Sequence, residues 1–127
     1  MKTGTRLAVT TIGCVLLILG LTVPAQAHDL RANLYACAPD GHGYCGFGQE
    51  RDHHQIIDAC DQLADGHGLY VKYTLFGGHE GKVGDANGSK SGCGIRRVGS
   101  ATYPIVRFNV CVDVPLEPDM CTGWKWA

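Results

Sequence analysis

Two long segments of the chain alternate between apolar and polar residues, which is the pattern of a β-strand with one buried face. Leu69–Phe76 is rich in residues with high β-propensity, and its alternate positions fall on two distinct faces. Ile105–Val114 repeats the pattern, with Phe108 and four valines on one face. Two shorter segments, Ala32–Ala38 and Cys93–Val98, are also expected to be strands. Together they predict a small, mostly antiparallel sheet of three to four strands.

The segment from about Arg51 to Asp65 has the spacing of a helix instead. Asp52 suits the N-cap position, Gln55 stands three residues later as its capping-box partner, and Gly66 follows as a stop signal. The order of strand, helix and further strands predicts an α+β domain in which the sheet packs against one helix. Apolar residues recur three and four positions apart along this segment and form one stripe: Ile56, Ile57, Cys60, Leu63 and Ala64.

Two glycine-rich segments, Gly41–Gly48 and Gly77–Gly92, separate these elements and are expected to be loops. Cys45 lies within the first, and Cys93 directly follows the second. Both cysteines are therefore expected to anchor loops. Because loops held by a rigid scaffold commonly carry function, contacts with a partner are expected there.

The N-terminal segment Met1–Ala27 does not alternate between apolar and polar residues, and its pattern predicts a secretory signal peptide. Its apolar run, Leu7–Val23, is shorter than the roughly 20 apolar residues of a membrane span, and Ala25–Ala27 has the small-x-small pattern of a cleavage site. We therefore expect a signal peptide at residues 1–27 and one domain at residues 28–127. That domain is expected to be secreted and extracellular, without a stable membrane anchor.

Loss of this segment removes one of the seven cysteines, Cys14, and leaves an even set. Six cysteines in a small exported domain predict three disulfides, each of which typically contributes about 2–4 kcal/mol of stability. The sequence does not choose among the pairings. The chain has no Cys-x-x-Cys pair, so neither a zinc site nor another cofactor is expected. The expected disulfide cysteines are Cys37, Cys45, Cys60, Cys93, Cys111 and Cys121.

The charge balance excludes a strongly basic surface. The whole chain carries a net charge of −1 with histidine neutral, and loss of Lys2 and Arg6 leaves nine basic residues against twelve acidic ones. Because nucleic-acid affinity comes largely from neutralised phosphates, a nucleic-acid partner is not expected. We expect a monomer that binds an extracellular or host protein or a glycan.

Several residues have types that suit catalysis. His79 and Glu80, together with Arg96, match the proton-transfer and charge-stabilising groups of a small secreted ribonuclease. Arg97 and Arg107 are further candidates for the stabilising charge. No ordered match to a ribonuclease active site and no other hydrolase motif is present, so an enzyme is the less favoured interpretation.

Other residues have types that suit metals, sugars or modification. Cleavage after Ala27 would expose His28, whose amine and imidazole resemble the copper ligands of lytic polysaccharide monooxygenases. Asn87 begins an N-glycosylation sequon. Trp124 and Trp126 could stack on sugar rings or anchor an interface, although folding back over the sheet is the favoured expectation. One face of the predicted helix would carry His54, Asp58, Asp61 and Asp65, which could bind a metal, although a solvated acidic stripe is the favoured expectation.

The combination of signal peptide, six cysteines, glycine-rich loops and no catalytic signature resembles small secreted cysteine-rich effectors and toxin-like proteins that fungi export. Asp58–Leu63 with Cys60, a strand, and then Ser91–Ile95 with Cys93 is similar to the fungal necrosis-inducing effector family. That family's pattern places the first of these cysteines on a helix. The favoured function is a non-enzymatic binder that presents loops from a disulfide-braced scaffold, as an effector, toxin or inhibitor. A small secreted hydrolase and a copper-binding protein led by His28 remain alternatives.

Overall fold

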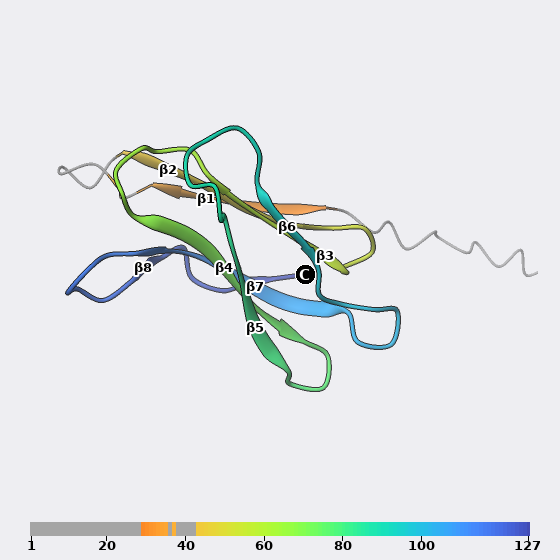
Figure 1. Cartoon of the computed structure of the whole chain (residues 1–127). Helices are drawn as coiled ribbons and strands as arrows, with labels where there is room; N and C mark the ends of the chain where they lie inside the picture. Colours follow the sequence, from red (N-terminus) through yellow and green to blue (C-terminus); the bar gives the residue numbers. More distant parts are fainter. Residues whose placement is uncertain (1–28, 36, 38–42) are drawn as a thin grey trace, which may run out of the picture.

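The computed structural model describes residues 29–35, 37 and 43–127. The expected signal peptide and His28 lie outside these residues. Within them the chain forms nine strands and no helix, and about 54% of the residues are in strands. The strands form two antiparallel sheets that lie one over the other (Figure 1). The predicted α+β class is therefore wrong, and the architecture is a β-sandwich.

The chain passes between the two sheets three times. Sheet A has the order β1 (Leu30–Tyr35), β2 (Tyr44–Arg51), β3 (Ile56–Asp61) and β6 (Gly94–Arg97). Sheet B has the order β5 (Glu80–Gly84), β4 (Gly68–Leu75), β7 (Ile105–Asp113) and β8 (Met120–Cys121), and β9 (Lys125–Trp126) also pairs with β7. The crossings follow β3, β5 and β6, so the two sheets are interlocked in sequence.

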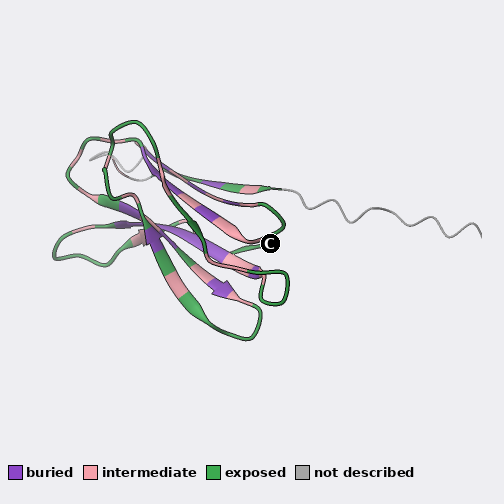
Figure 2. Ribbon diagram, turned by 45° about the vertical axis from the view of Figure 1, so that its right-hand side comes forward, coloured by how far each residue is buried: buried purple, intermediate pink, exposed green. Residues whose placement is uncertain are grey.

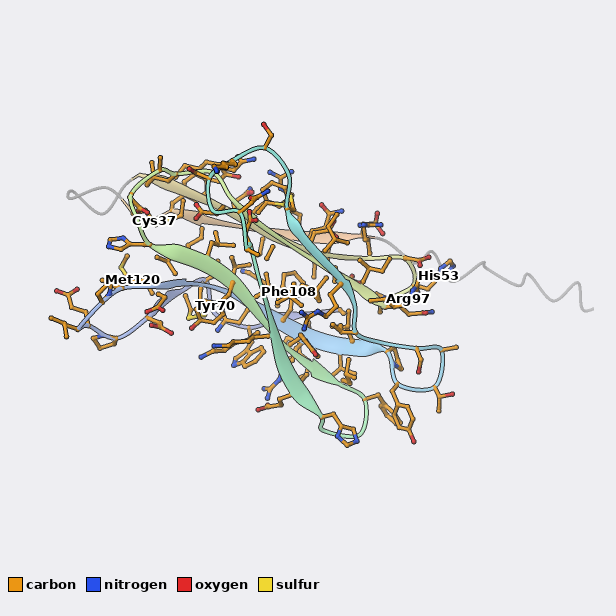
Figure 3. The ribbon with its side chains drawn as sticks, viewed as in Figure 1. Cys37, His53, Tyr70, Arg97, Phe108 and Met120 are labelled. Carbon is orange, nitrogen blue, oxygen red and sulfur yellow. A yellow bond between two sulfur atoms is a disulfide. The ribbon has the colours of Figure 1, made fainter. Side chains whose placement is uncertain are left out.

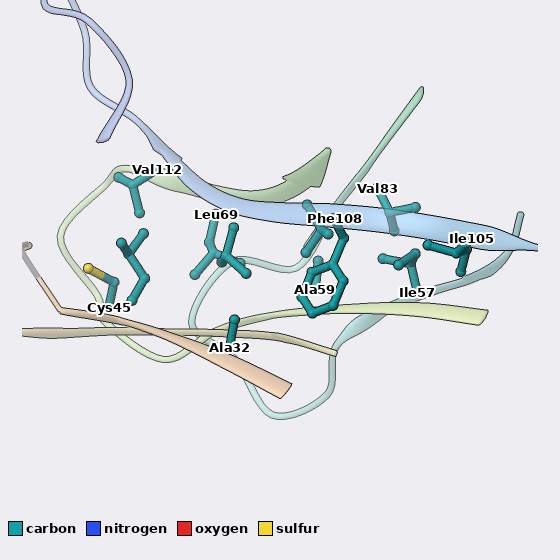
Figure 4. Packing of buried hydrophobic residues seen from close by; sticks show 12 residues of the cluster. Ala32, Cys45, Ile57, Ala59, Leu69, Val83, Ile105, Phe108 and Val112 are labelled. Atoms are coloured by element: carbon teal, nitrogen blue, oxygen red, sulfur yellow. The ribbon is translucent and has the colours of Figure 1, made fainter. Parts of the chain in front are cut away.

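The hydrophobic core lies between the inner faces of the two sheets, where the buried residues gather (Figure 2). Phe108 on β7 has 0% of its surface exposed and projects between the sheets (Figures 3 and 4). Burial of this apolar area is the main force that holds the sheets together. The buried cluster comprises Ala32, Leu34, Cys45, Ile57, Ala59, Leu69, Val71, Val83, Ile105, Phe108, Val110 and Val112.

The two long predicted strands are confirmed as β4 and β7, which pair with each other from Gly68 opposite Asp113 to Leu75 opposite Ile105. The predicted inward face of β7 is confirmed for its central residues. A register shift at Thr74 and Leu75 leaves one extra residue on β7, so that Ile105 also reaches the core. The predicted strands near the N-terminus and after Cys93 are confirmed as β1 and β6, with shifted ends.

The predicted helix between Arg51 and Asp65 is wrong. This segment contains the end of β2, a turn and β3, where Ile57 and Ala59 face the core and Cys60 faces away from it. Strand β3 pairs with β2 over six consecutive positions. In so short a segment, helical spacing and strand alternation share many positions, and the β-branched Ile56 and Ile57 favour the strand once a partner is available.

The predicted loop Gly41–Gly48 belongs to β2 from Tyr44 onwards, and Gly48 lies on the inner face of that strand. A Cβ atom at Gly48 would lie 2.5 Å from Val110 Cγ2 and 2.6 Å from Val71 Cγ2. Glycine is thus required for the close approach of the two sheets rather than for flexibility. The other predicted loop, Gly77–Gly92, contains β5.

The turn between β2 and β3 is held in an unusual backbone conformation. Asp52, His53 and His54 have φ angles of 54°, 56° and 60°. The left-handed conformation costs about 1–2 kcal/mol for each non-glycine residue. Two contacts from later parts of the chain offset this cost: Ile105 N donates to His54 O at 2.7 Å, and Arg97 forms an ion pair with Asp52.

All six expected cysteines are paired, in three disulfides. Cys60 on β3 is bonded to Cys93, which directly precedes β6, the neighbouring strand. The other pairs are Cys37–Cys45 and Cys111–Cys121, the latter between facing residues of β7 and β8. Cys60, which lies on the apolar stripe of the predicted helix, thus links two strands of sheet A instead. Three disulfides in a domain of this size are typical of extracellular proteins.

Candidate binding face

The residues considered for a hydrolase lie in different places. The rings of His79 and Tyr103 are in edge contact, with their centroids 6.3 Å apart. Glu80 lies on β5 and pairs with Arg107 of β7 at 3.5 Å. Arg96 lies on β6, in the other sheet. The structure therefore brings the side chains of Glu80 and Arg107 together, whereas the ring of His79, the residue before Glu80, contacts Tyr103, and Arg96 lies on the other sheet.

The helix face with His54, Asp58, Asp61 and Asp65, whether a solvated acidic stripe or a metal site, does not form, because the predicted helix is absent. His54 Nδ1 lies 2.8 Å from Glu50 Oε2, and Asp58 accepts a hydrogen bond from Arg51 Nε at 2.7 Å. Over residues 29–35, 37 and 43–127, no group of three or more His, Cys, Asp or Glu side chains is arranged to hold a metal ion. The copper hypothesis rests on His28, which lies outside the described residues.

A different set of side chains gathers on the outer face of sheet B. The alternation that directs Leu69 and Val71 into the core directs their neighbours on β4 outward, and β5 and β7 add side chains on the same side. The chain after β8 brings both tryptophans to this face. We use the term outer face of sheet B for Tyr70, Lys72, Thr74, Glu80, Lys82, Arg107, Asn109, Trp124 and Trp126.

Arg107 positions the two tryptophans. Its Cζ lies 4.2 Å from the ring centroid of Trp124 and 5.6 Å from that of Trp126. Thr74 Oγ1 accepts a hydrogen bond from Arg107 Nε at 3.1 Å, and Glu80 Oε1 lies 3.5 Å from Arg107 Nη2, so two neighbouring side chains restrain the guanidinium. Trp124 remains 38% exposed and Trp126 69% exposed. The tryptophans therefore do fold back over the sheet, but they leave ring surface open to a ligand.

Two lysines face each other directly across neighbouring strands. Lys72 of β4 and Lys82 of β5 are register partners with exposed side chains, and their Nζ atoms lie 5.7 and 5.5 Å from the ring centroid of Tyr70. Among the described residues, no acidic side chain lies within 4.0 Å of either ammonium group. Like charges in this arrangement repel each other. The pair is thus a local concentration of positive charge without a counterion among the residues that the structure describes.

A groove of about 450 Å³ opens beside this pair. A second groove of about 480 Å³ adjoins it, and Lys82 lines both. Asp85, Asp113 and Asp119 give the second groove a mixed charge together with Arg96. We call the first the Trp124 groove; its lining residues are Lys72, Tyr73, Glu80, Gly81, Lys82 and Trp124.

Tyr70 lines the second groove and provides a neutral ring near both lysines. Its hydroxyl donates a short hydrogen bond to the carboxylate of Asp119. Burial, this hydrogen bond and the charges of Asp119 and Asp113 raise the pKa of Tyr70 well above its ordinary value. The phenol therefore stays protonated near neutral pH, and its ring can attract the ammonium groups of the lysines on either side.

The sequence indicated only part of this face. Trp124 and Trp126 were candidates because they are two tryptophans at one end of the chain. Lys72 could have been recognised as an outward residue of Leu69–Phe76, but its partner Lys82 lies in a segment expected to be a loop. The β4–β5 hairpin was therefore the missing information.

The glycosylation prediction for Asn87 is neither strengthened nor weakened by its position. Asn87 lies in the exposed segment between β5 and β6, where its Nδ2 donates to Ser91 O at 3.1 Å.

Within the residues that the structure describes, no helix is long and apolar enough to cross a membrane. Comparison of the chain with protein-family models, curated proteins and solved structures found no match.

Proposed function

We propose that this protein is a secreted, non-enzymatic binding protein that acts outside the cell, as an effector, toxin or inhibitor. The small disulfide-braced sandwich supports a role as a rigid scaffold. The single observation that carries the proposal is the outer face of sheet B, where Trp124 and Trp126 are held open by Arg107. Tryptophan and arginine are the residues most enriched among those that dominate binding energy.

The binding surface in this proposal is the face of a sheet rather than a loop. Backbone pairing of β4 with β5 and β7 fixes the outward side chains, and the Cys111–Cys121 disulfide attaches β8 to β7. The tryptophans follow β8, so their approach to the face is restrained as well. A ligand then binds with little loss of conformational freedom in the protein, which favours affinity.

The proposal is tested by measuring binding of the oxidised protein to a panel of immobilised polysaccharides and purified extracellular proteins. A variant with Trp124→Ala and Trp126→Ala should lose at least about tenfold in affinity for any ligand that the wild type binds. Phe76→Ala is the matched control, because Phe76 is 62% exposed but lies at the end of the β4–β5 hairpin. If the tryptophan variant kept full affinity, the binding surface would lie elsewhere and the proposal would be wrong.

A further inference from the structure

We propose that the Trp124 groove binds an acidic carbohydrate, in which the carboxylate of a uronic acid unit lies between Lys72 and Lys82 and a sugar ring packs against Trp124. This inference rests on the proposed function and specifies the ligand class of the same face. Lys72, Lys82 and Trp124 all line the groove, so one small ligand can reach the three side chains together.

The lysine pair supplies the argument from charge. Lys72 and Lys82 are directly opposed on an exposed sheet face, where an oppositely charged or neutral partner would be more stable. Natural sequences depart from such local rules mainly at functional sites. A carboxylate placed between the two ammonium groups would remove their repulsion and form two charge-assisted hydrogen bonds.

Trp124 supplies the argument for a ring. The indole borders the groove and is held by Arg107, whose Cζ lies 4.2 Å from the ring centroid. The C–H groups of a sugar ring form an apolar surface that packs on an indole face. Because the indole is already ordered, this contact costs little conformational entropy.

The remaining lining residues favour a hydroxyl-rich ligand over a dense polyanion. Glu80 lines the same groove, and its carboxylate would repel closely spaced phosphates but can accept hydrogen bonds from sugar hydroxyls. A volume of about 450 Å³ is within the range of small-ligand sites. These features together favour a uronate over an acidic peptide or a nucleic acid.

Isothermal titration calorimetry of the oxidised protein tests this inference with three probes: trigalacturonic acid, the neutral trimer galactotriose, and an aspartate-rich peptide. Trigalacturonic acid should bind at least about tenfold more tightly than either other probe, and its affinity should fall as salt rises. Lys72→Ala, Lys82→Ala and Trp124→Ala should each weaken its binding about tenfold or more. The control Lys90→Ala removes an exposed lysine from the segment between β5 and β6 and should leave the affinity unchanged.

Each other outcome overturns the inference in a distinguishable way. Equal binding of galactotriose would show that the lysines do not select an acid, and tighter binding of the peptide would assign the face to an acidic protein. Full affinity of Lys72→Ala and Lys82→Ala would place the carboxylate elsewhere. If none of the three probes bound, the inference would fail, and the proposed function would stand only if the panel showed tryptophan-dependent binding to another ligand.

Discussion

The buried Glu50 and the half-buried His54 form a polar pair at the start of the β2–β3 turn, with Glu50 Oε2 2.8 Å from His54 Nδ1. The Glu50 side chain is 1% exposed, and its other oxygen, Oε1, has no hydrogen-bond partner among the described residues. Burial raises the pKa of Glu50, although the interaction with His54 opposes part of this effect. The folded state therefore holds the Glu50 proton more tightly than the unfolded chain does.

The first prediction concerns stability against pH. Because the folded-state pKa of Glu50 lies above its ordinary value of 4.5, its stabilising contribution is fully present below pH 4.5 and is lost as pH rises through the folded value. The glutamine side chain of the variant Glu50→Gln cannot ionise. The unfolding free energy of this variant minus that of the wild type should therefore increase as pH rises from 4.5 through the folded-state pKa of Glu50. Urea unfolding from about pH 4 to pH 8 measures the difference. Glu117→Gln, at an exposed position, is the control for loss of a charge.

The second prediction concerns the opposed lysines. Lys72→Glu places a negative charge opposite Lys82 and should raise the unfolding free energy by about 0.5–1 kcal/mol, measured by denaturant unfolding at low salt. The gain should shrink in about 1 M salt, where exposed charges are screened. The control Lys90→Glu has no such register partner and should show no gain. A loss of stability in Lys72→Glu would mean that the two ammonium groups do not repel.

The third prediction concerns the left-handed turn. His53 has a φ of 56° and a side chain that is 77% exposed, so the conformational cost is not offset by burial. His53→Gly should stabilise the protein by about 1 kcal/mol, because glycine adopts this conformation without strain. His53→Ala keeps the strain and should show no comparable gain. Thermal unfolding of the two variants makes the comparison, and equal melting temperatures would argue against a left-handed residue here.

The fourth prediction compares two disulfides. Cys60–Cys93 and Cys111–Cys121 span 33 and 10 residues, and loop-closure entropy predicts contributions of about 3.7 and about 2.7 kcal/mol. Replacing both cysteines of the first pair by alanine should therefore cost about 1 kcal/mol more than the same change in the second. Each pair contains one buried cysteine, Cys60 in the first and Cys111 in the second, so packing losses enter both variants. Equilibrium unfolding in urea without reductant measures both, and the reverse order would contradict the pairing described.

Sequence patterns were sufficient for β4 and β7, where alternation runs for eight residues or more and sets the buried face. They failed between Arg51 and Asp65, because Ile56, Ile57 and Cys60 satisfy both a helical and a strand pattern. Only pairing with β2 resolves that choice, and β2 was itself hidden by its glycines. Gly48 is required by contact with the opposite sheet, which no local pattern reveals.

Local sequence patterns also predicted only part of the candidate binding face. The sequence indicated Trp124 and Trp126 by residue type, and the alternation of β4 places Lys72 outward. The pairing of Lys72 with Lys82 and the approach of Arg107 to Trp124 depend on strand order, which arises from long-range contacts. Expectations about loops were misplaced because two glycine-rich segments contain β2 and β5.

The most direct test of the account uses the indole N–H signals of the protein's two tryptophans in a ¹H–¹⁵N NMR spectrum. On addition of trigalacturonic acid, the Trp124 indole signal and the backbone amide signals of Lys72 and Lys82 should shift together and saturate at one ligand concentration. These shifts should be absent in Lys72→Ala. If both indole signals stayed unchanged while amides of the segment between β5 and β6 shifted, the ligand would bind a loop, and the outer face of sheet B would not be the binding surface.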